Sequence, residues 1–365
     1  MCYAGIKAET STVPTSCVTT VSTQKRLSGI EALRGIAATV VVFSHAARHV
    51  DKAFGAPGLI TAFQAGHAGV DLFFVLSGFI ILFVHRRDIG QPGRLQHYLG
   101  RRFNRVMPLY WLVLALTIGM SVAGRHDAPS LLWLLWSAAL LPSLSEPLLG
   151  IAWTLQFEVV FYAAFAVLIV SRGTGLALLA VWFAWIVAAA LGLDSTGVPG
   201  SLCGFYGLEF FMGMGVAQLL SRGHIPLPRL LAGAGLALFA TMMVLESAGI
   251  LNGFGIVARF AYGLPAALLV LGVAAEQSGH LQVPNWLRTL GGASYSIYLF
   301  QFVFIGTVWQ GWLKLGLDHQ ASNLACFLVL ASAALVGGIF AARLVEQPLL
   351  RLMRGRRRAL RPQQA

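Results

Sequence analysis

The segment that decides the fold is Ile30-Glu-Ala-Leu-Arg-Gly-Ile-Ala-Ala-Thr-Val-Val-Val-Phe-Ser-His45. Between Arg34 and His45 it has no charged residue and is mostly apolar, as expected of a helix that crosses a membrane. Eleven helical steps of about 100° return His45 to within roughly 20° of Arg34, about 16 Å further along the axis. One helix face therefore carries a cation and a proton-transfer group at two depths.

Two interpretations of this pair stay open on its own residues. Arg34 can be an anchor at the membrane boundary, with His45 a polar side chain satisfied inside a bundle. Alternatively both have a function, because ionisable groups within hydrocarbon cost roughly a few kcal/mol and are rarely present without one. The other polar groups must decide between the two.

The composition of the whole chain is that of a membrane protein. Of its 365 residues 57% are hydrophobic and 11% are charged, and its mean hydropathy is +0.74. A soluble domain usually carries about 25% charged residues. Apolar runs of roughly 20 residues, enough to cross a bilayer, recur along nearly the whole length. We therefore predict an all-α, polytopic helix bundle embedded in a lipid bilayer.

Ten apolar segments are predicted to cross the membrane. They cover about 30–47, 66–85, 106–123, 151–171, 175–193, 204–221, 229–247, 256–275, 291–313 and 322–345. The apolar segment 130–142 is too short to cross comfortably and contains two tryptophans, which favours an interfacial or re-entrant helix. Residues 1–26 are predicted to form a disordered cytoplasmic tail and residues 351–365 a basic one, which leaves 27–350 as the membrane domain.

The positive charge of the chain predicts its orientation. A net charge of +12 could indicate a nucleic-acid partner, but the arginines gather at the ends of apolar segments, so we expect no such partner. In the ten-span topology, 20 of the 26 Lys and Arg residues fall on one side and five on the other. We therefore expect a bacterial inner-membrane protein with both termini in the cytoplasm.

Three ionisable residues are predicted to form the catalytic set near the outer side. His45 lies in the outer half of its span, Asp71 near the outer end of the next, and Glu158 about 10 Å deep in its own. An imidazole suits a general base near neutral pH, and a carboxylate can orient the ring. We therefore expect His45, Asp71 and Glu158 to share one depth.

Four arginines are predicted at the opposite, inner end. Arg34, Arg101, Arg102 and Arg105 all fall there, and the last two share a helix face if the third span begins early. Guanidinium groups pair bidentately with phosphate oxygens, so this cluster suits a phosphorylated donor. The arrangement predicts transfer of an acyl group from a cytoplasmic donor to a hydroxyl on the far side. No metal-binding spacing occurs, and no metal is expected.

At this point the sequence resembles acyltransferase family 3 of integral membrane O-acyltransferases, in particular the branch that modifies bacterial exopolysaccharides. The matching motifs are, in chain order, Ile30-Glu-Ala-Leu-Arg-Gly-Ile-Ala-Ala with the pair Arg34 and His45, Gly69-Val-Asp-Leu-Phe-Phe-Val-Leu-Ser-Gly-Phe79, Arg102-x-x-Arg105 before Pro108-Leu-Tyr-Trp, Trp153-Thr-Leu-x-x-Glu158 with Phe161-Tyr162, Ser294-Tyr-Ser-Ile-Tyr-Leu299 and Glu346-Gln-Pro348.

The resemblance covers roughly residues 27–350 and implies a ten-span fold, an acyl-coenzyme A donor, which would be acetyl-coenzyme A for an O-acetyltransferase, and a sugar hydroxyl of an envelope or exported glycan as acceptor. It implies that His45 is the base, that Arg34, Arg102 and Arg105 serve the donor, and that Glu158 belongs to the polar core. Many relatives place a His after the Ser-Tyr-x-Ile-Tyr-Leu motif, where this chain has Phe300-Gln301. No soluble second transferase domain follows residue 350, so the acyl group should go directly to the acceptor or to a separate protein.

Two other functions remain in competition. A transporter or flippase would use the buried Arg, His and Glu groups as a substrate or proton path. Against it, the sequence shows no convincing repeat of its two halves, and the ionisable groups concentrate in the first 160 residues. A non-catalytic partner of polysaccharide export machinery would tolerate His45→Ala.

Overall fold

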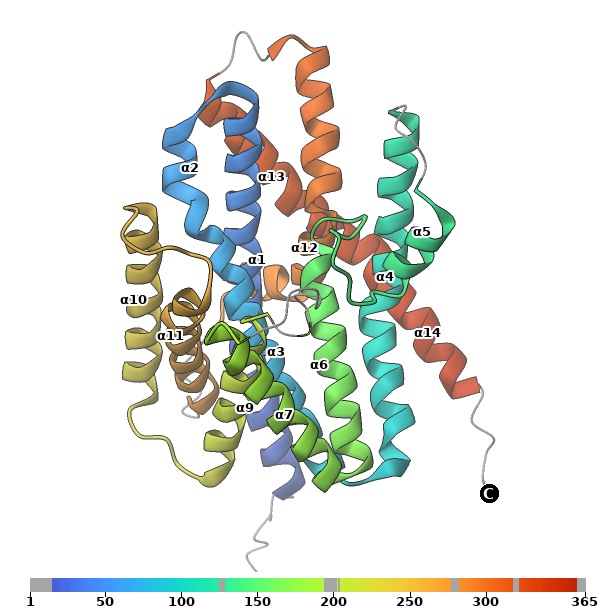
Figure 1. The fold of residues 1–365 in the computed structure, drawn as a ribbon, viewed down its shortest axis with the longest axis vertical. Coiled ribbons are helices and arrows are strands. Elements are labelled where there is room, and N and C mark those ends of the chain that lie inside the picture. The colour runs from blue at the N-terminus through green and yellow to red at the C-terminus, as the bar shows by residue number, and fades with distance from the viewer. Residues whose placement is uncertain are drawn as a thin grey trace, which may run out of the picture.

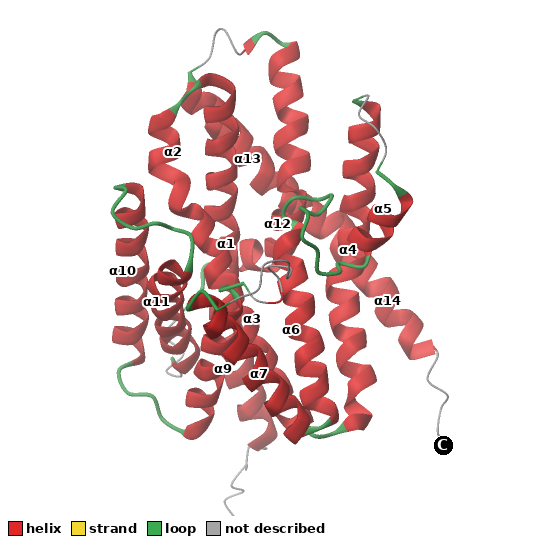
Figure 2. Ribbon diagram, viewed as in Figure 1, coloured by secondary structure: helices red, strands yellow, loops and turns green. Residues whose placement is uncertain are grey.

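A computed structural model of the chain describes residues 15–124, 129–193, 202, 204–276, 282–317 and 322–359 (Figure 1). These residues form helices and connecting loops, and no strand occurs among them (Figure 2). The predicted all-α helix bundle is confirmed.

The helical elements follow one another along the chain. They are α1 (Thr15–Phe54), α2 (Pro57–Phe63), η1 (Gln64–Ala68), α3 (Gly69–His85), η2 (Arg86–Asp88), η3 (Pro92–Arg94), α4 (Leu95–Ala123), α5 (Leu131–Ala138), α6 (Ala152–Val170), α7 (Arg172–Ala190), α9 (Gly207–Arg222), α10 (Pro228–Ser247), α11 (Ile256–Ala275), α12 (Asn285–Lys314), α13 (Asn323–Ala341), the π-helical turn η5 (Ala342–Glu346) and α14 (Gln347–Ala359).

Nine helical segments in the described part of the chain are long and apolar enough to cross a membrane. The one remaining predicted span, 204–221, corresponds to α9, which is 16 residues long. The short segment 130–142 contains α5, only 8 residues long and capped by the Ser130 hydroxyl, which accepts from the Trp133 backbone N–H. The chain is therefore a multi-pass membrane protein, in which nine of the ten predicted crossings are long and apolar enough among the described residues.

Three boundaries differ from the sequence-based prediction. Helix α1 begins at Thr15, within the predicted tail 1–26, and residues 1–14 lie outside the described part. Helix α4 begins at Leu95, earlier than the predicted 106, because Tyr98 is fully buried and its hydroxyl donates to the Tyr162 carbonyl at 3.2 Å. Helix α14 extends through Ala359 into the predicted tail 351–365, whose last residues, 360–365, are outside the described part.

Helices α1 and α12 cross closely enough to need glycine on both sides. A Cβ on Gly35 would lie 2.7 Å from the Gly291 backbone nitrogen, and a Cβ on Gly291 would lie 2.2 Å from the Glu31 carbonyl oxygen. Glycines at such positions let two membrane helices approach backbone to backbone. The crossing brings Ser294 of α12 next to Arg34 of α1.

Helix α1 runs upward in Figure 1, so Arg34 lies below His45 along the bundle. Helix α14 ends toward the same lower side from which α1 starts. That arrangement is compatible with an even number of crossings. We call the lower side the Arg34 end and the upper side the His45 end.

Candidate active site

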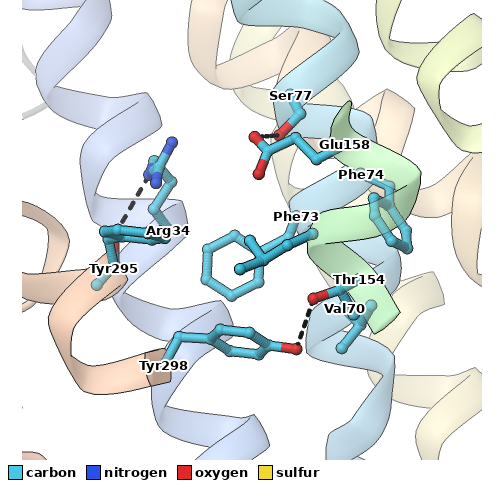
Figure 3. Close-up of a pocket in the computed structure, with 11 residues that line it drawn as sticks. Arg34, Val70, Phe73, Phe74, Ser77, Thr154, Glu158, Tyr295 and Tyr298 are labelled. Carbon is cyan, nitrogen blue, oxygen red and sulfur yellow. Dashed lines mark hydrogen bonds between the residues drawn. The ribbon is translucent and has the colours of Figure 1, made fainter. Parts of the chain in front are cut away.

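Arg34 faces a small cavity between α1, α3, α6 and α12, here called the inner cavity (Figure 3). Its volume is about 60 Å³. Figure 3 shows Arg34, Ser77 and Glu158 toward one end, and Thr154 and Tyr298 toward the other. Its lining is formed by Arg34, Val70, Phe73, Phe74, Ser77, Thr154, Leu155, Glu158, Ser294, Tyr295 and Tyr298.

The two charged residues of the inner cavity are held by neutral hydroxyl groups. Arg34 Nε donates to Ser294 Oγ at 3.3 Å, and Arg34 forms no ion pair with a carboxylate of the described residues. Glu158 Oε1 accepts from the Tyr162 hydroxyl and, at 3.5 Å, from Ser77 Oγ. Because a neutral hydroxyl leaves most of a charged group's hydrogen-bonding capacity unused, both charges remain available to a ligand.

Arg102 borders the same region from α4. Its Nη2 donates to His85 Nε2 at 3.0 Å, and its guanidinium lies 5.5 Å from the centroid of the Tyr162 ring. The ring orientation of His85 is fixed by Asp88, whose Oδ2 lies 2.8 Å from His85 Nδ1. Arg102 Nε is buried and has no hydrogen-bond partner in the structure. A buried N–H without a partner costs stability, so this donor is a point where a ligand oxygen would be favoured.

Arg105 lies one turn further along α4. Its Nη1 pairs with Glu346 Oε1 at 3.2 Å, and its guanidinium lies 5.4 Å from the centroid of the Tyr295 ring, which lines the inner cavity. The turn η5 ends at Glu346, whose Oε2 also accepts from Ser296 Oγ at 2.6 Å. Arg34 is within electrostatic range of Arg105. Neither Arg102 nor Arg105 lines the inner cavity itself: Arg105 lies behind its wall residue Tyr295, and Arg102 lies against Tyr162, which bonds to Glu158.

Arg101 differs from the other three predicted donor-binding arginines. It is exposed, whereas Arg34, Arg102 and Arg105 are partly buried. One residue along a helix is a rotation of about 100°, so a side chain adjacent to Arg102 cannot face the same wall. The structure therefore separates Arg101 from the cluster.

His45 is held by an amide instead of a carboxylate. Its Nδ1 lies 2.9 Å from Gln301 Oε1, and Gln301 Nε2 donates to the Tyr298 carbonyl at 2.9 Å. Since the amide nitrogen is engaged there, the amide oxygen faces the ring, and His45 Nδ1 must carry the hydrogen. The other nitrogen, Nε2, has no partner among the described residues and is left as the acceptor. The expectation of a carboxylate partner is wrong, although the position of Gln301 after the Ser294–Leu299 motif was a usable signal.

His45 lines a second hollow, here called the outer cleft, with a volume of about 730 Å³. Phe302 packs against the His45 ring with centroids 4.7 Å apart. The cleft lies between α1, the loop before α6, the first turns of α6, and α12. It is lined by His45, Arg48, His49, Lys52, Ser143, Leu144, Ser145, Glu146, Pro147, Gly150, Trp153, Gln156, Phe157 and Phe302.

Asp71 is not beside His45. It pairs with Arg259 of α11, which also approaches Glu209 of α9 at 3.6 Å; the three side chains are 0–1% exposed. Tyr206 closes this group, with its ring centroid 4.0 Å from the Arg259 guanidinium. Asp71, Glu209 and Arg259 are called the buried ion cluster below. Asp71 lies on the side of α3 that faces α9 and α11. Its position along the sequence of α3 does not predict which neighbouring helix it contacts.

Glu158 also departs from the expected shared depth. It faces the inner cavity with Arg34, whereas His45 lines the outer cleft. Figure 1 shows that α6 begins well below the upper end of α1. Counting residues from a helix start gives a common depth only when the helices start at the same level. The three predicted catalytic residues therefore occupy three different environments, and their roles stay predictions.

Comparisons with known proteins agree with the motifs. The family model for an acyltransferase domain of type 3 matches residues 27–343. The exopolysaccharide production protein ExoZ of Rhizobium meliloti (strain 1021) is 33% identical over 318 residues, which cover 81% of this chain and 93% of that protein. Protein 2 in the picA locus of Rhizobium radiobacter is 33% identical over 99 residues, 26% of this chain and 46% of that protein. No solved structure matches. The family match spans most of the chain, and the chain therefore belongs to acyltransferase family 3.

Proposed function

We propose that the protein is an O-acyltransferase that moves an acyl group, acetyl in the simplest case, from cytoplasmic acyl-coenzyme A to a hydroxyl of an exported or envelope glycan. Its family supports acyl transfer. A relative named for exopolysaccharide production supports a glycan acceptor. The observation that carries the proposal is that α1 presents Arg34 to the inner cavity and His45 to the outer cleft.

The Arg34 end of the bundle suits the donor. Arg34 and Arg102 form no ion pair with a carboxylate of the described residues, and Arg102 Nε is buried without a partner. Phosphate oxygens of a nucleotide carrier would pair with these guanidinium groups and satisfy that donor. A bound acyl thioester would supply the activated acyl carbon. Its extended arm would enter between α1 and α6, toward Thr154 and Tyr298.

The His45 end suits the acceptor. With Nδ1 held by Gln301, His45 Nε2 can take the proton of an acceptor hydroxyl. The hydroxyl oxygen then forms a bond to the acyl carbon, and the carbon–sulfur bond of the thioester breaks. The imidazolium returns its proton to the departing thiolate. Each atom and proton is accounted for, and no metal ion is needed.

In the proposed orientation the Arg34 end faces the cytoplasm and the His45 end faces away from it, across the bacterial inner membrane. The excess of Lys and Arg on the Arg34 side supports this orientation. Both termini would then be cytoplasmic. Machinery for polysaccharide export is a fitting partner, because the acceptor would be acylated as it leaves the cell.

The test is replacement of His45 in a strain that lacks its own copy of the gene. With His45→Ala, we expect O-acylation of the glycan to be lost in mass spectra, and turnover in isolated membranes to fall about 10²–10⁴-fold, the usual contribution of a positioned base. Binding of acyl-coenzyme A should persist. The matched control is His224→Ala, which removes an exposed imidazole that lines neither hollow.

Two results would contradict the proposal. Near-normal transfer by folded His45→Ala protein would place the base elsewhere. Glycans that carry the same acyl groups in the presence and absence of the gene would contradict transfer to a glycan and favour the transporter function.

A further inference from the structure

The outer cleft contains two cations that the catalytic steps do not use. Arg48 and Lys52 follow His45 on α1 by three and seven residues, so they lie about one and two turns beyond it along the same side of the helix. Both are exposed, and both line the cleft. Arg48 is close enough to act electrostatically on the His45 ring.

These cations are not neutralised by the protein. Neither Arg48 nor Lys52 forms an ion pair with a carboxylate of the described residues, although Asp51 follows on the same helix and Glu146 lines the opposite wall of the cleft. A guanidinium and an ammonium with free donors are suited to anionic oxygen atoms. The cleft therefore presents unpaired positive charge next to the proposed base.

The position of these charges in the membrane topology makes them unusual. In the ten-span topology only five of the 26 Lys and Arg residues are assigned to the His45 side, and one of them, Arg259, belongs to the buried ion cluster. Two of the five line this one cleft. Cations on that side are depleted because they oppose correct insertion, so topology does not explain why they gather here.

The remaining lining suits a saccharide. Trp153, Phe157 and Phe302 provide apolar ring faces, and Gln156, Ser143 and Ser145 provide polar groups. Ligand sites combine apolar walls with a few polar groups in this way, and a volume of about 730 Å³ is within the range of small-ligand pockets, about 300–1,000 Å³.

We propose that the acceptor is an anionic glycan and that Arg48 and Lys52 bind carboxylate groups on the sugars next to the one that is acylated. This inference rests on the proposed function, because it concerns the acceptor side of the same site. Two cations about one turn apart would hold the acidic chain in register and present one hydroxyl to His45 Nε2.

The test measures glycan binding to the full-length protein in lipid nanodiscs, without any acyl donor. The probes are oligogalacturonate and oligomannuronate, each paired with its neutral methyl ester. We expect the acid forms to bind about tenfold more tightly than the esters at low salt, and the preference to shrink as salt is added. Arg48→Gln and Lys52→Gln should each weaken binding of the acids about two- to fivefold, as expected for one exposed ion pair, and leave ester binding unchanged.

Two variants make the result specific. Lys52→Arg keeps the charge and should retain the preference for acids. Lys314→Gln removes an exposed cation from the same end of the bundle outside the cleft, and should bind like the wild type. Folding of each variant is checked by its thermal unfolding midpoint.

The inference is contradicted if acid and ester bind equally, if neither binds, or if a phosphorylated oligomannoside binds where both uronates fail. Each of these leaves the proposed function standing when the wild type still transfers acyl groups to its cellular glycan. Conversely, a clear preference for acids in a protein that fails to consume acyl-coenzyme A would support binding of an anionic glycan in the outer cleft. It would contradict the proposed acyl transfer.

Discussion

The buried ion cluster and the two hollows along α1 differ in how their ionisable side chains are partnered inside the bundle. In the cluster, Asp71 and Glu209 surround Arg259, and all three are sealed from solvent. Along α1, Arg34 and His45 have only neutral partners, Ser294 and Gln301, and each faces open volume. In the cluster each charge lies beside an opposite charge of the protein, although Asp71 Oδ2, Arg259 Nε and both Glu209 carboxylate oxygens have no hydrogen-bond partner. On α1 the partners are neutral side chains beside open volume.

The difference between the two regions is one of partners. Any ionisable side chain within hydrocarbon needs a partner, since burying it alone costs several kcal/mol, by an order-of-magnitude estimate. The two regions also differ in burial, because the cluster side chains are 0–1% exposed whereas Arg34 and His45 are partly exposed. The useful distinction is whether the partner is a charge of the protein or an empty space.

The largest expected effect is on stability, from breaking the buried ion cluster. Asp71→Ala leaves Arg259 with a weaker partner, Glu209, at 3.6 Å, and breaking a buried ion pair costs about 3–5 kcal/mol. We expect a clearly lower thermal unfolding midpoint in detergent and a lower yield of monodisperse protein. The fraction that folds should keep most of its turnover.

Glu158→Gln is the matched control for this prediction. It also removes a carboxylate charge from a helix interior, but Glu158 pairs with hydroxyl groups beside a cavity, so its loss should affect turnover more than stability. If Asp71→Ala is stable and inactive while Glu158→Gln is unstable and active, the distinction between the two regions is wrong.

A smaller effect is expected from the amide that holds His45. Gln301→Leu removes the acceptor at 2.9 Å from His45 Nδ1, so the ring N–H lacks a partner when the ring gains its positive charge in the transition state, a loss of about 1–3 kcal/mol there. At about 1.4 kcal/mol per tenfold change in rate, kcat should fall about five- to 100-fold. The KM for acyl-coenzyme A should not change, because the arginines proposed to bind this donor lie toward the Arg34 end of the bundle.

Gln301→Glu tests whether position or packing matters. It keeps an oxygen that accepts from Nδ1, so it should recover much of the kcat lost in Gln301→Leu. Equal losses in both variants, with a matching loss of stability, would show that Gln301 serves helix packing and does not position the base.

Much of the fold could be predicted from the sequence because it depends on properties within single helices. Length and hydropathy locate the spans, and helical periodicity places Arg34 with His45 on α1 and Arg102 with Arg105 on α4. The starts of α1 and α4 were missed because their first turns are polar. Tyr98 anchors the beginning of α4 through a contact with α6 that no local pattern contains.

The pairing of side chains between helices could not be predicted in the same way. Arg259 lies 188 residues from Asp71, and Gln301 lies 256 residues from His45. Which faces meet depends on crossings such as that of Gly35 with Gly291, and on the level at which α6 starts. Depth along a helix therefore assigned Asp71 and Glu158 to the wrong neighbours.

A further prediction, on KM instead of stability or kcat, compares two adjacent arginines. Arg102→Ala removes a guanidinium whose Nε is buried without a hydrogen-bond partner. Loss of a hydrogen bond to a charged group costs about 1.5–3 kcal/mol, which corresponds to a KM for acyl-coenzyme A raised about ten- to 100-fold. The value of kcat should change little, because a phosphate group distant from the reacting carbon is bound equally in the ground state and the transition state. Arg101→Ala removes the same charge from the neighbouring, exposed position and should leave KM nearly unchanged.

Comparing Arg101→Ala with Arg102→Ala shows whether the KM effect comes from a directed contact or from the general positive charge of this region. If the arginines only attract anions or orient the protein in the membrane, the two substitutions should raise KM equally, and added salt should remove both effects. If Arg102 makes a directed contact, its effect should persist at high salt while that of Arg101 vanishes. A fall in kcat at unchanged KM would instead place Arg102 near the reacting atoms, and the donor would then enter the bundle from a different side than the one proposed.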